Sequence, residues 1–298
     1  MSRTKGIDVS HWQGSVDFEK VRADGCRFVI LNAGYGKFDS QKDERFEENY
    51  KKAKAAGLGV GAYWYSYALT EADALAEAKC FCKALSGKQL DYPVAFDIED
   101  RTQSSLPAQT IGKIITAFCS YLEKQGYYVS LYSYVSFLEN KVPAAVRSKY
   151  DIWVANFDVT KPSYTGPYGM WQYTSSAFVS GVTGKCDCDY AYKDYPALIK
   201  DAGLNGYTKP SPKPALKVLD IKGLKQGDKN LGVYELKSML SLAEEKGLIS
   251  VHITVDDGFG IATRGVVDSM LTRWGYKPNG IAGQGFVERL TDDLKKKI

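Results

Sequence analysis

Histidine is scarce in this chain, whose 298 residues include only His11 and His252. A proline-alternating stretch at residues 207–214 separates the two, so we expect them to belong to different domains. A serine or cysteine hydrolase needs an imidazole beside its nucleophile, and no such triad is apparent here. A metal-dependent deacetylase needs several histidine ligands, which the chain also lacks. We therefore expect neither a metal nor a cofactor.

Long apolar runs and a strong charge of one sign are also missing. No run approaches the roughly 18 apolar residues of a membrane span. Residues 1–6 lead into the first expected strand without an apolar signal region, which predicts either synthesis in the cytosol without export or a sequence shown without its leader. The net charge is only +4, so the chain lacks the strong positive charge that is typical of nucleic-acid-binding proteins.

Six cysteines are present, but their spacing matches no disulfide framework. Cys80 and Cys82 are two positions apart on an expected helix, where they cannot face each other. Cys186 and Cys188 flank Asp187 on an expected strand and point away from it. Zinc ligation also needs a different spacing. We therefore expect reduced, mostly buried thiols.

Short apolar strands alternate with amphipathic helices over the first two thirds of the chain. The expected strands cover residues 5–9, 27–33, 59–67, 94–97, 128–134, 152–155, 169–173 and 188–190. The expected helices cover residues 18–23, 43–56, 71–85 and 108–125, with a short piece near 144–149. Five strand–helix units followed by three strands predict an α/β fold, an irregular TIM-like (β/α)5(β)3 barrel.

The domain boundary is expected at the proline-alternating stretch. Residues 1–205 form the expected catalytic barrel, and residues 206–217 form an extended, semi-stiff spacer. Residues 218–298 are too few for a second barrel and form an expected small helical domain. Its helices are expected near residues 233–246, 263–274 and 284–296.

Asp97, Ile98 and Glu99 follow an apolar strand and are the most informative residues of the chain. Successive side chains on a strand alternate between faces, so Asp97 and Glu99 share one. Two acids beside a hydrophobic core have their pKa values pushed apart, which suits the acid and base of a site that cleaves a glycosidic bond. The alternative is a structural role, in which the acids cap a loop or pair with Arg101.

Four segments, in order along the chain, resemble glycoside hydrolase family 25, the muramidases typified by fungal and phage lysozymes of the Chalaropsis type. They are residues 6–18, 61–65, 96–99 and 171–189, within a resemblance that covers about residues 5–195. Cys186, Cys188 and Trp64 depart from the usual family pattern. The resemblance implies the barrel fold and hydrolysis of the β-1,4 bond from N-acetylmuramic acid to N-acetylglucosamine in peptidoglycan.

The resemblance also implies catalytic roles for residues of this chain. Glu99 is the implied general acid, and Asp8, Asp97 and Asp187 complete an acidic cleft. A substrate-assisted, retaining route and an inverting route through Asp8 or Asp187 both remain open. A structural role in loop capping is the alternative for Asp8 and Asp187.

Aromatic residues are abundant, at 13% of the chain with 21 tyrosines. Aromatic faces stack on sugars, and a glutamine can bond an N-acetyl group. The candidate substrate-binding residues are Tyr63, Tyr65, Tyr132, Trp153 and Gln172. Core filling is the alternative for each. His11 either contacts substrate or is structural, whereas Asp189 is expected to be structural and Asp17 to be a helix N-cap.

The tail resembles a small three-helix peptidoglycan-binding domain at residues 257–263 and 280–283, but it departs from that pattern at residues 270–271. This likeness implies wall binding by the tail. Together with the missing leader, it predicts a phage-type endolysin that acts on the cell wall after release. A bacterial autolysin and a secreted form stay open.

Two other functions compete with the muramidase. One is an inactive barrel that binds the cell wall as a lectin, although the retained carboxylates argue against it. The other is a chitinase-like glycosidase, which also ends a strand in Asp-x-Glu. Such enzymes usually have another Asp two positions upstream, where this chain has Ala95.

Overall fold

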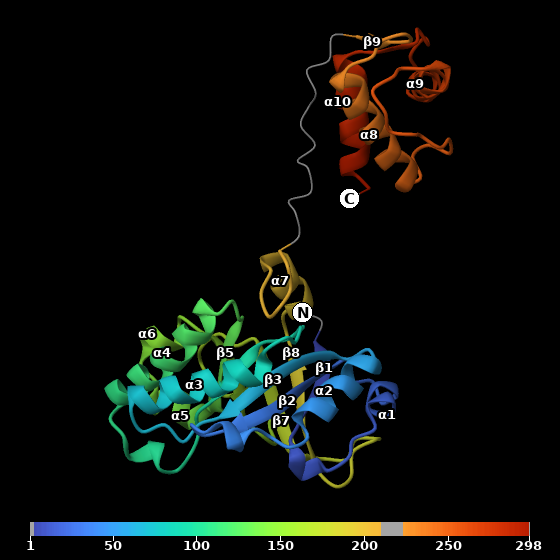
Figure 1. Ribbon diagram of the computed structural model, residues 1–298. Helices are drawn as coiled ribbons and strands as arrows, with labels where there is room; N and C mark the ends of the chain where they lie inside the picture. Colours follow the sequence, from blue (N-terminus) through green and yellow to red (C-terminus); the bar gives the residue numbers. More distant parts are fainter. Residues whose placement is uncertain (1–2, 210–222, 298) are drawn as a thin grey trace. The chain divides into compact units, whose positions relative to one another are not determined.

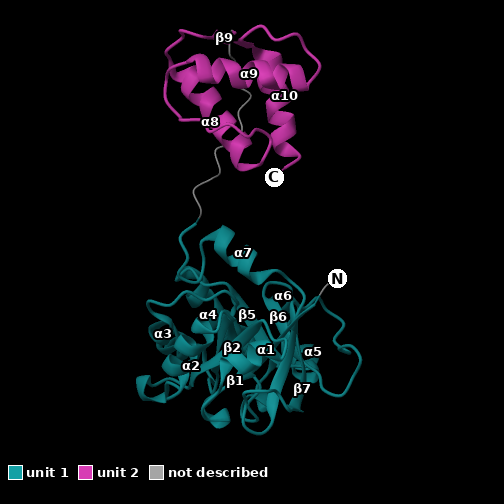
Figure 2. Ribbon diagram, turned by 90° about the vertical axis from the view of Figure 1, so that its right-hand side faces the viewer, with its two compact units in different colours: residues 1–211 teal, residues 212–298 magenta. Residues whose placement is uncertain are grey.

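The computed structural model describes residues 3–209 and 223–297. The chain divides into two compact units, residues 1–211 and 212–298 (Figure 2). Residues 210–217 of the expected spacer lie outside the described residues. The Tyr207 hydroxyl donates to Asp91 Oδ1 at 2.6 Å, so the chain still packs on the first unit past residue 206, where the sequence predicts the start of the spacer.

Eight strands of the first unit close into a barrel (Figure 1). They are β1 (Thr4–Val9), β2 (Phe28–Tyr35), β3 (Gly59–Tyr65), β4 (Val94–Asp97), β5 (Val129–Tyr134), β6 (Asp151–Ala155), β7 (Met170–Ala177) and β8 (Cys186–Ala191). Strands β1 to β7 pair in parallel with their neighbours, and β8 runs antiparallel to both β7 and β1.

Helices follow the first five strands and the last one. They are α1 (Phe18–Ala23), α2 (Phe46–Ala55), α3 (Glu71–Leu85), α4 (Ala108–Lys124), α5 (Val135–Lys141), α6 (Ala144–Arg147) and α7 (Tyr195–Ala202). No described helix lies between β6 and β8. The predicted (β/α)5(β)3 barrel is therefore confirmed.

Alternation along each strand divides the side chains between the barrel interior and the helical layer. On β3, Trp64 is buried against Phe81 of α3, whereas its neighbours Tyr63 and Tyr65 point into the barrel. On β4, Phe96 stacks on Phe118 of α4 with ring centroids 4.0 Å apart. Burying these rings between sheet and helix removes large apolar surfaces from water, which holds the helical layer in place.

Side-chain caps begin two of the helices. Asp17 Oδ1 accepts from the Lys20 amide at 3.1 Å, which confirms Asp17 as the N-cap of α1. Thr70 caps α3 in the same way through the Asp73 amide. Such caps satisfy amides that the first helical turn leaves without partners.

The structure differs from the prediction at several elements. Helices α5 and α7 were not predicted, and β7 and β8 are longer than expected. Helix α2 begins at Phe46 instead of residue 43. The Asp43 carboxylate accepts from the amides of His11 and Arg45, so this residue joins the loop after β1 to the start of α2 instead of entering the helix.

The second unit contains three helices and a two-stranded ribbon. The helices are α8 (Leu231–Glu245), α9 (Ile261–Arg273) and α10 (Gln284–Lys295). They agree with the three predicted helices, whereas the ribbon of β9 (Leu224–Lys225) and β10 (Ile281–Ala282) was not predicted. Buried Leu236, Val267 and Leu290 contribute one residue from each helix to a single core. Among the described residues of either unit, no helix is long and apolar enough to cross a membrane.

Candidate active site

A cleft of about 860 Å³ opens at the barrel mouth, where the carboxyl ends of the parallel strands meet. All nine site residues predicted from the sequence line it. They are Asp8, Tyr63, Tyr65, Asp97, Glu99, Tyr132, Trp153, Gln172 and Asp187. The cleft is also lined by Ser10, His11, Trp12, Asn32, Tyr35, Tyr67, Tyr134, Ala155, Phe157 and Ser175.

The four acids reach this cleft from three strands. Asp8 lies near the end of β1, Asp97 ends β4, and Glu99 follows two residues later. Asp187 is the second residue of β8. Because β8 is antiparallel, its beginning lies at the rim where the other strands end, and Asp187 pairs in register with Asp8.

Asp97 and Glu99 share one face, as the strand alternation predicts. Both line the cleft, while Ile98 between them is fully buried in the core outside the barrel. The Ile98 amide donates to the Tyr132 carbonyl at 3.2 Å, so the chain stays extended one residue past β4. This extension carries Glu99 to the rim.

The hydrogen bonds in the cleft hold Asp8 in place, but among the described residues they leave one oxygen of the Asp97 carboxyl group without a donor. Gln172 Nε2 donates to Asp8 Oδ2 at 2.8 Å, and the Tyr132 hydroxyl donates to Gln172 Oε1 at the same distance. Oδ1 of Asp97 is buried and receives no hydrogen bond from the residues that the structure describes. A buried carboxyl oxygen without a donor is costly, and such groups concentrate at functional sites.

Burial is the main cause of the raised pKa values of the four acids in the cleft. It raises the pKa of Glu99 to about 7, with further contributions from Asp187 and Asp100. It raises the pKa of Asp187 to about 6. The pKa values of Asp8 and Asp97 are also raised by burial, and then by the neighbouring carboxyls. Near neutrality the cleft thus holds protons on some of its acids and negative charge on others.

Aromatic residues form both the floor and the rim of the cleft. Trp153 and Tyr132 are almost fully buried, with ring centroids 4.6 Å apart, so they build the floor. Trp12 is 83% exposed and lies on the rim with Phe157 and Tyr67. The sequence analysis missed these rim residues, although Trp12 lies within the first family-like segment.

Two residues whose roles the sequence left open have clear contacts. His11 Nδ1 lies 2.9 Å from Asp43 Oδ2, so a carboxylate orients this imidazole at the rim. Asp189 is fully buried beneath the cleft, and its Oδ1 accepts from Trp153 Nε1 at 2.8 Å. Neither contact resembles metal ligation. Within residues 3–209 and 223–297, no group of three or more His, Cys, Asp or Glu side chains has the geometry to hold a metal ion.

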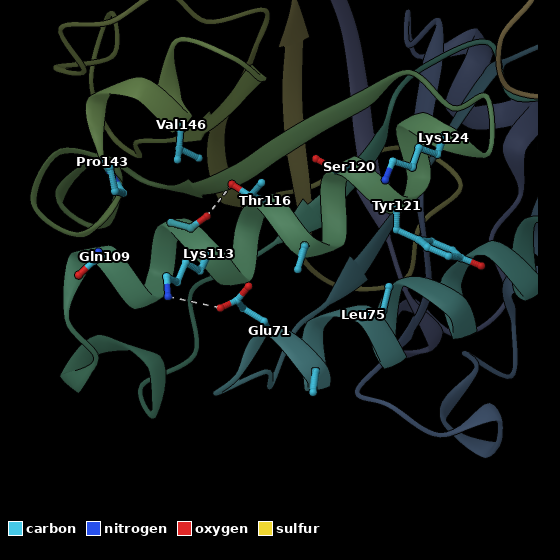
Figure 3. Close-up of a pocket in the computed structure, with 13 residues that line it drawn as sticks. Glu71, Leu75, Gln109, Lys113, Thr116, Ser120, Tyr121, Lys124, Pro143 and Val146 are labelled. Carbon is cyan, nitrogen blue, oxygen red and sulfur yellow. Dashed lines mark hydrogen bonds and ion pairs between the residues drawn. The ribbon is translucent and has the colours of Figure 1, made fainter.

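A separate hollow of about 710 Å³ lies on the outer, helical layer of the barrel unit (Figure 3). It is lined by α3 and α4, with Pro143 and Val146 beside them, and Lys113 pairs with Glu71 across it at 3.6 Å. It contains none of the four clustered acids. The cleft at the barrel mouth is therefore the candidate active site.

The comparisons with known proteins agree with this geometry. The model of Glycosyl hydrolases family 25 matches residues 7–182. The autolytic lysozyme of Clostridium acetobutylicum is 34% identical over 185 residues, which are 62% of this chain and 55% of that protein. The chain thus spans little more than half of that relative.

Two solved structures of lysozyme and autolysin proteins are also similar to this chain. A bacterial lysozyme from Streptomyces coelicolor has a TM-score of 0.60 and 27% identity, over 68% of this chain and 99% of that one. The modular autolysin LytC from Streptococcus pneumoniae, solved with a synthetic peptidoglycan ligand, has a TM-score of 0.56 and 30% identity, over 64% of this chain and 47% of that one.

Proposed function

Because the chain belongs to Glycosyl hydrolases family 25, we propose that it is a peptidoglycan muramidase. It hydrolyses the β-1,4 bond from N-acetylmuramic acid to N-acetylglucosamine. The observation that carries this proposal is the gathering of Asp8, Asp97, Glu99 and Asp187 in one aromatic-walled cleft. Paired carboxyls supply the acid and the stabilising charge that glycoside hydrolysis needs, and aromatic rims stack on sugar rings.

Glu99 is the proton donor in this proposal. Its pKa of about 7 keeps a substantial fraction protonated near neutrality, as a general acid requires. Protonation of the glycosidic oxygen lets the leaving sugar depart as an alcohol, while positive charge develops at the anomeric carbon. The ionised carboxylates around the cleft stabilise that charge.

The unpartnered Oδ1 of Asp97 favours the substrate-assisted route. It can accept the N–H of the substrate's 2-acetamido group and so orient the acetamido oxygen toward the anomeric carbon. Glu99 then activates water, and the product keeps its configuration. In the inverting alternative, Asp8 or Asp187 activates water directly. NMR of the first-formed anomer separates the two routes, since inversion eliminates participation by the acetamido group.

Mass spectrometry of digested walls tests the bond specificity. A muramidase leaves new reducing ends on N-acetylmuramic acid, whereas cleavage on the other side of the repeat leaves them on N-acetylglucosamine. A cell-wall lectin releases no new ends at all. A chitinase-like glycosidase degrades unsubstituted N-acetylglucosamine polymers and leaves walls largely intact.

For the C-terminal unit, we propose binding to the cell wall. The support is its likeness to small three-helix wall-binding domains at residues 257–263 and 280–283, and its excess of three positive charges over residues 210–298 (14 Lys+Arg against 11 Asp+Glu). A wall-binding module raises the local concentration of the tethered enzyme on its polymer.

A further inference from the structure

Glu77 is a buried acid that lies outside the catalytic cleft. It belongs to helix α3, only 1% of its surface is exposed, and it is not among the residues that line the cleft. Burying an acid in a protein is costly unless its oxygens receive hydrogen bonds. The contacts of Glu77 show what offsets that cost and what the acid holds in place.

Both oxygens of Glu77 accept hydrogen bonds from the loop that follows β3. Oε2 accepts from the Ser66 hydroxyl at 2.6 Å, and Oε1 accepts from the Tyr67 amide at 2.9 Å. The Ser66 amide in turn donates to the carbonyl of Asp97 at 2.9 Å, at the end of β4. Glu77 therefore holds the chain at the point where the rim residue Tyr67 lies beside the strand end that carries Asp97.

Gln103 joins this loop to the loop that carries Glu99. It is fully buried, and its Nε2 donates to the Ser66 hydroxyl oxygen at 3.2 Å and to the Ala68 carbonyl at 3.1 Å. Its Oε1 accepts from the amide of Asp100, the residue after Glu99, at 3.2 Å. Because the Ala68 carbonyl needs a donor and the Asp100 amide needs an acceptor, these contacts fix the orientation of the Gln103 side chain.

The Ser66 hydroxyl has one proton and two lone pairs, and its contacts use all three. The lone pairs accept from Gln103 Nε2 and from the Ala68 amide, which lies 3.1 Å away. The proton therefore goes to Glu77, whose other oxygen accepts from the Tyr67 amide. A protonated Glu77 would have a hydrogen of its own to donate, and neither the Ser66 oxygen nor the Tyr67 amide can accept it. This set of hydrogen bonds is thus complete only when Glu77 is ionised.

We propose that Glu77 is a positioning residue, a buried carboxylate that holds the loops after β3 and β4 so that Tyr67 and Glu99 both face the cleft. It acts through the Ser66 hydroxyl and the Gln103 side chain and does not touch the substrate. The inference rests on the proposed muramidase function, because it gives Glu77 a role in the same site.

Two charged groups act on Glu77 with opposite sign. Asp73 of α3 raises its pKa and Lys37 of the loop after β2 lowers it, and these two pair with each other at 2.6 Å. The Cys80 thiol of α3 also interacts with Glu77, whereas the hydroxyl and amide groups that approach from the loops after β3 and β4 are neutral. Burial is the largest influence and raises the pKa of Glu77 to about 7. The hydrogen-bond network is therefore complete above that pH and loses one of its acceptors below it.

Glu77→Gln tests the proposal, because the amide keeps the shape of the acid but has only one accepting oxygen, like the protonated acid. At about pH 8, kcat/KM on soluble glycan fragments should be about 10-fold or more below that of wild type, since misplaced catalytic groups lose rate steeply. At about pH 5, where Glu77 of the wild type is itself protonated, the two proteins should agree within about threefold. The ionisation of Glu99 affects both proteins and cancels in the ratio of their activities. A residue that only fills space would give a ratio that is independent of pH.

Ser66→Ala removes the bridge between Glu77 and Gln103 with little change in volume. It should lower kcat/KM by a similar factor at about pH 8, and the double variant should be no slower than either single variant, because both changes remove the same contact. Glu71→Gln, on the exposed side of the same helix, is the matched control and should retain wild-type activity at both pH values. Thermal unfolding of each variant shows that it is folded at the assay temperature.

Hydrogen–deuterium exchange measures the positions of the loops without using activity. At one pH near 8, the amides of residues 66–68 and 99–103 should exchange at least about threefold faster in Glu77→Gln than in wild type, because the loops open more often. In Glu71→Gln they should exchange at the wild-type rate.

Two results would overturn the proposal. One is a ratio of Glu77→Gln to wild-type activity that stays constant from about pH 5 to 8. The other is equal exchange of the two loops in Glu77→Gln and wild type. If the exchange rates differ as expected but the wild-type protein cleaves no wall polymer, the proposed function fails and the positioning of the loops stands, so the two failures are distinguishable.

Discussion

In the barrel unit, Asp8, Asp97 and Asp189 lie at most 5% exposed beside other acids, and their pKa values are raised. In the C-terminal unit, Asp256 lies at the surface 2.9 Å from Lys237, and its pKa is lowered, chiefly by the hydrogen bond from Lys237. Glu244 likewise accepts from the Ile253 amide and from His252, which lower its pKa.

The difference between the units follows from what each can tolerate. The barrel has a large core of strands and helices that offsets the cost of buried acids, whereas the C-terminal unit has one small core. Of the buried acids with raised pKa values, Asp8 and Asp97 line the cleft. In the smaller unit, the acids stabilise loops and helix ends.

The largest effect should come from removing the acid in the cleft. Glu99→Gln should lower kcat by about 10²- to 10⁴-fold, because the amide cannot donate a proton to the leaving oxygen. Release of reducing ends from walls measures this. Glu123→Gln, on the exposed side of α4, is the matched control and should retain wild-type activity. Near-normal turnover in Glu99→Gln would remove Glu99 from its role.

Removing the C-terminal unit should change activity on walls but not on soluble fragments. A chain of residues 1–209 should clear wall suspensions about 10-fold or more slowly, because it loses its tether. Its kcat on soluble glycan fragments should match that of the full chain, which also shows that the barrel folds by itself. Equal clearing rates would contradict wall binding by the tail.

The stabilities of the two units should respond differently to pH between about 5 and 8. In the folded barrel the pKa is about 7 for Glu99 and Glu77 and about 8 for Asp189, whereas the same groups unfolded titrate near 4. The folded barrel therefore binds more protons across this range, and its stability falls as the pH rises.

In the C-terminal unit, Glu244 and Asp256 have lowered pKa values and stay ionised in both states above about pH 5. Their stabilisation is lost only as the pH falls below that value. Calorimetry of the full chain at several pH values should show a barrel transition that moves to lower temperature from pH 5 to 8, while the tail transition stays nearly constant. A barrel transition that rises with pH would contradict this.

The smallest effects should come from neutralising one acid in each unit. Asp97→Asn should raise the barrel Tm at pH 8, because burial disfavours the charged form of Asp97 and one of its oxygens is buried without a partner among the described residues. Asp256→Asn should lower the tail Tm, since it removes the carboxylate that pairs with Lys237, whose side chain is only 8% exposed. A higher barrel Tm in Asp97→Asn together with a lower tail Tm in Asp256→Asn would confirm that the two acids affect the stability of their units in opposite directions. A lower barrel Tm in Asp97→Asn at pH 8 would contradict this.

Local sequence patterns were sufficient to predict much of the fold. The spacing of Asp97 and Glu99 predicted that they share one face of the strand, and both line the cleft. This pattern depends only on the geometry of an extended chain. Helices α5 and α7 were missed because they are only 7 and 8 residues long, so that each offers about two turns of pattern.

Long-range contacts could not be predicted in the same way. The bond from Gln172 to Asp8 joins residues 164 positions apart, and the Asp43 contact that delays α2 reaches back to His11. Asp189 had the same strand-face signal as Asp187, but its depth below the cleft depends on how the barrel closes.

The sequence by itself determined the order of strands and helices, the faces on which the acids lie and the family to which the chain belongs, because these depend on neighbouring residues. Only the tertiary structure decided which acids meet and which of them keep protons. The physical reason is that burial and charge proximity act through space: the antiparallel β8 places Asp187 opposite Asp8 and encloses Asp189 where water cannot solvate its charge.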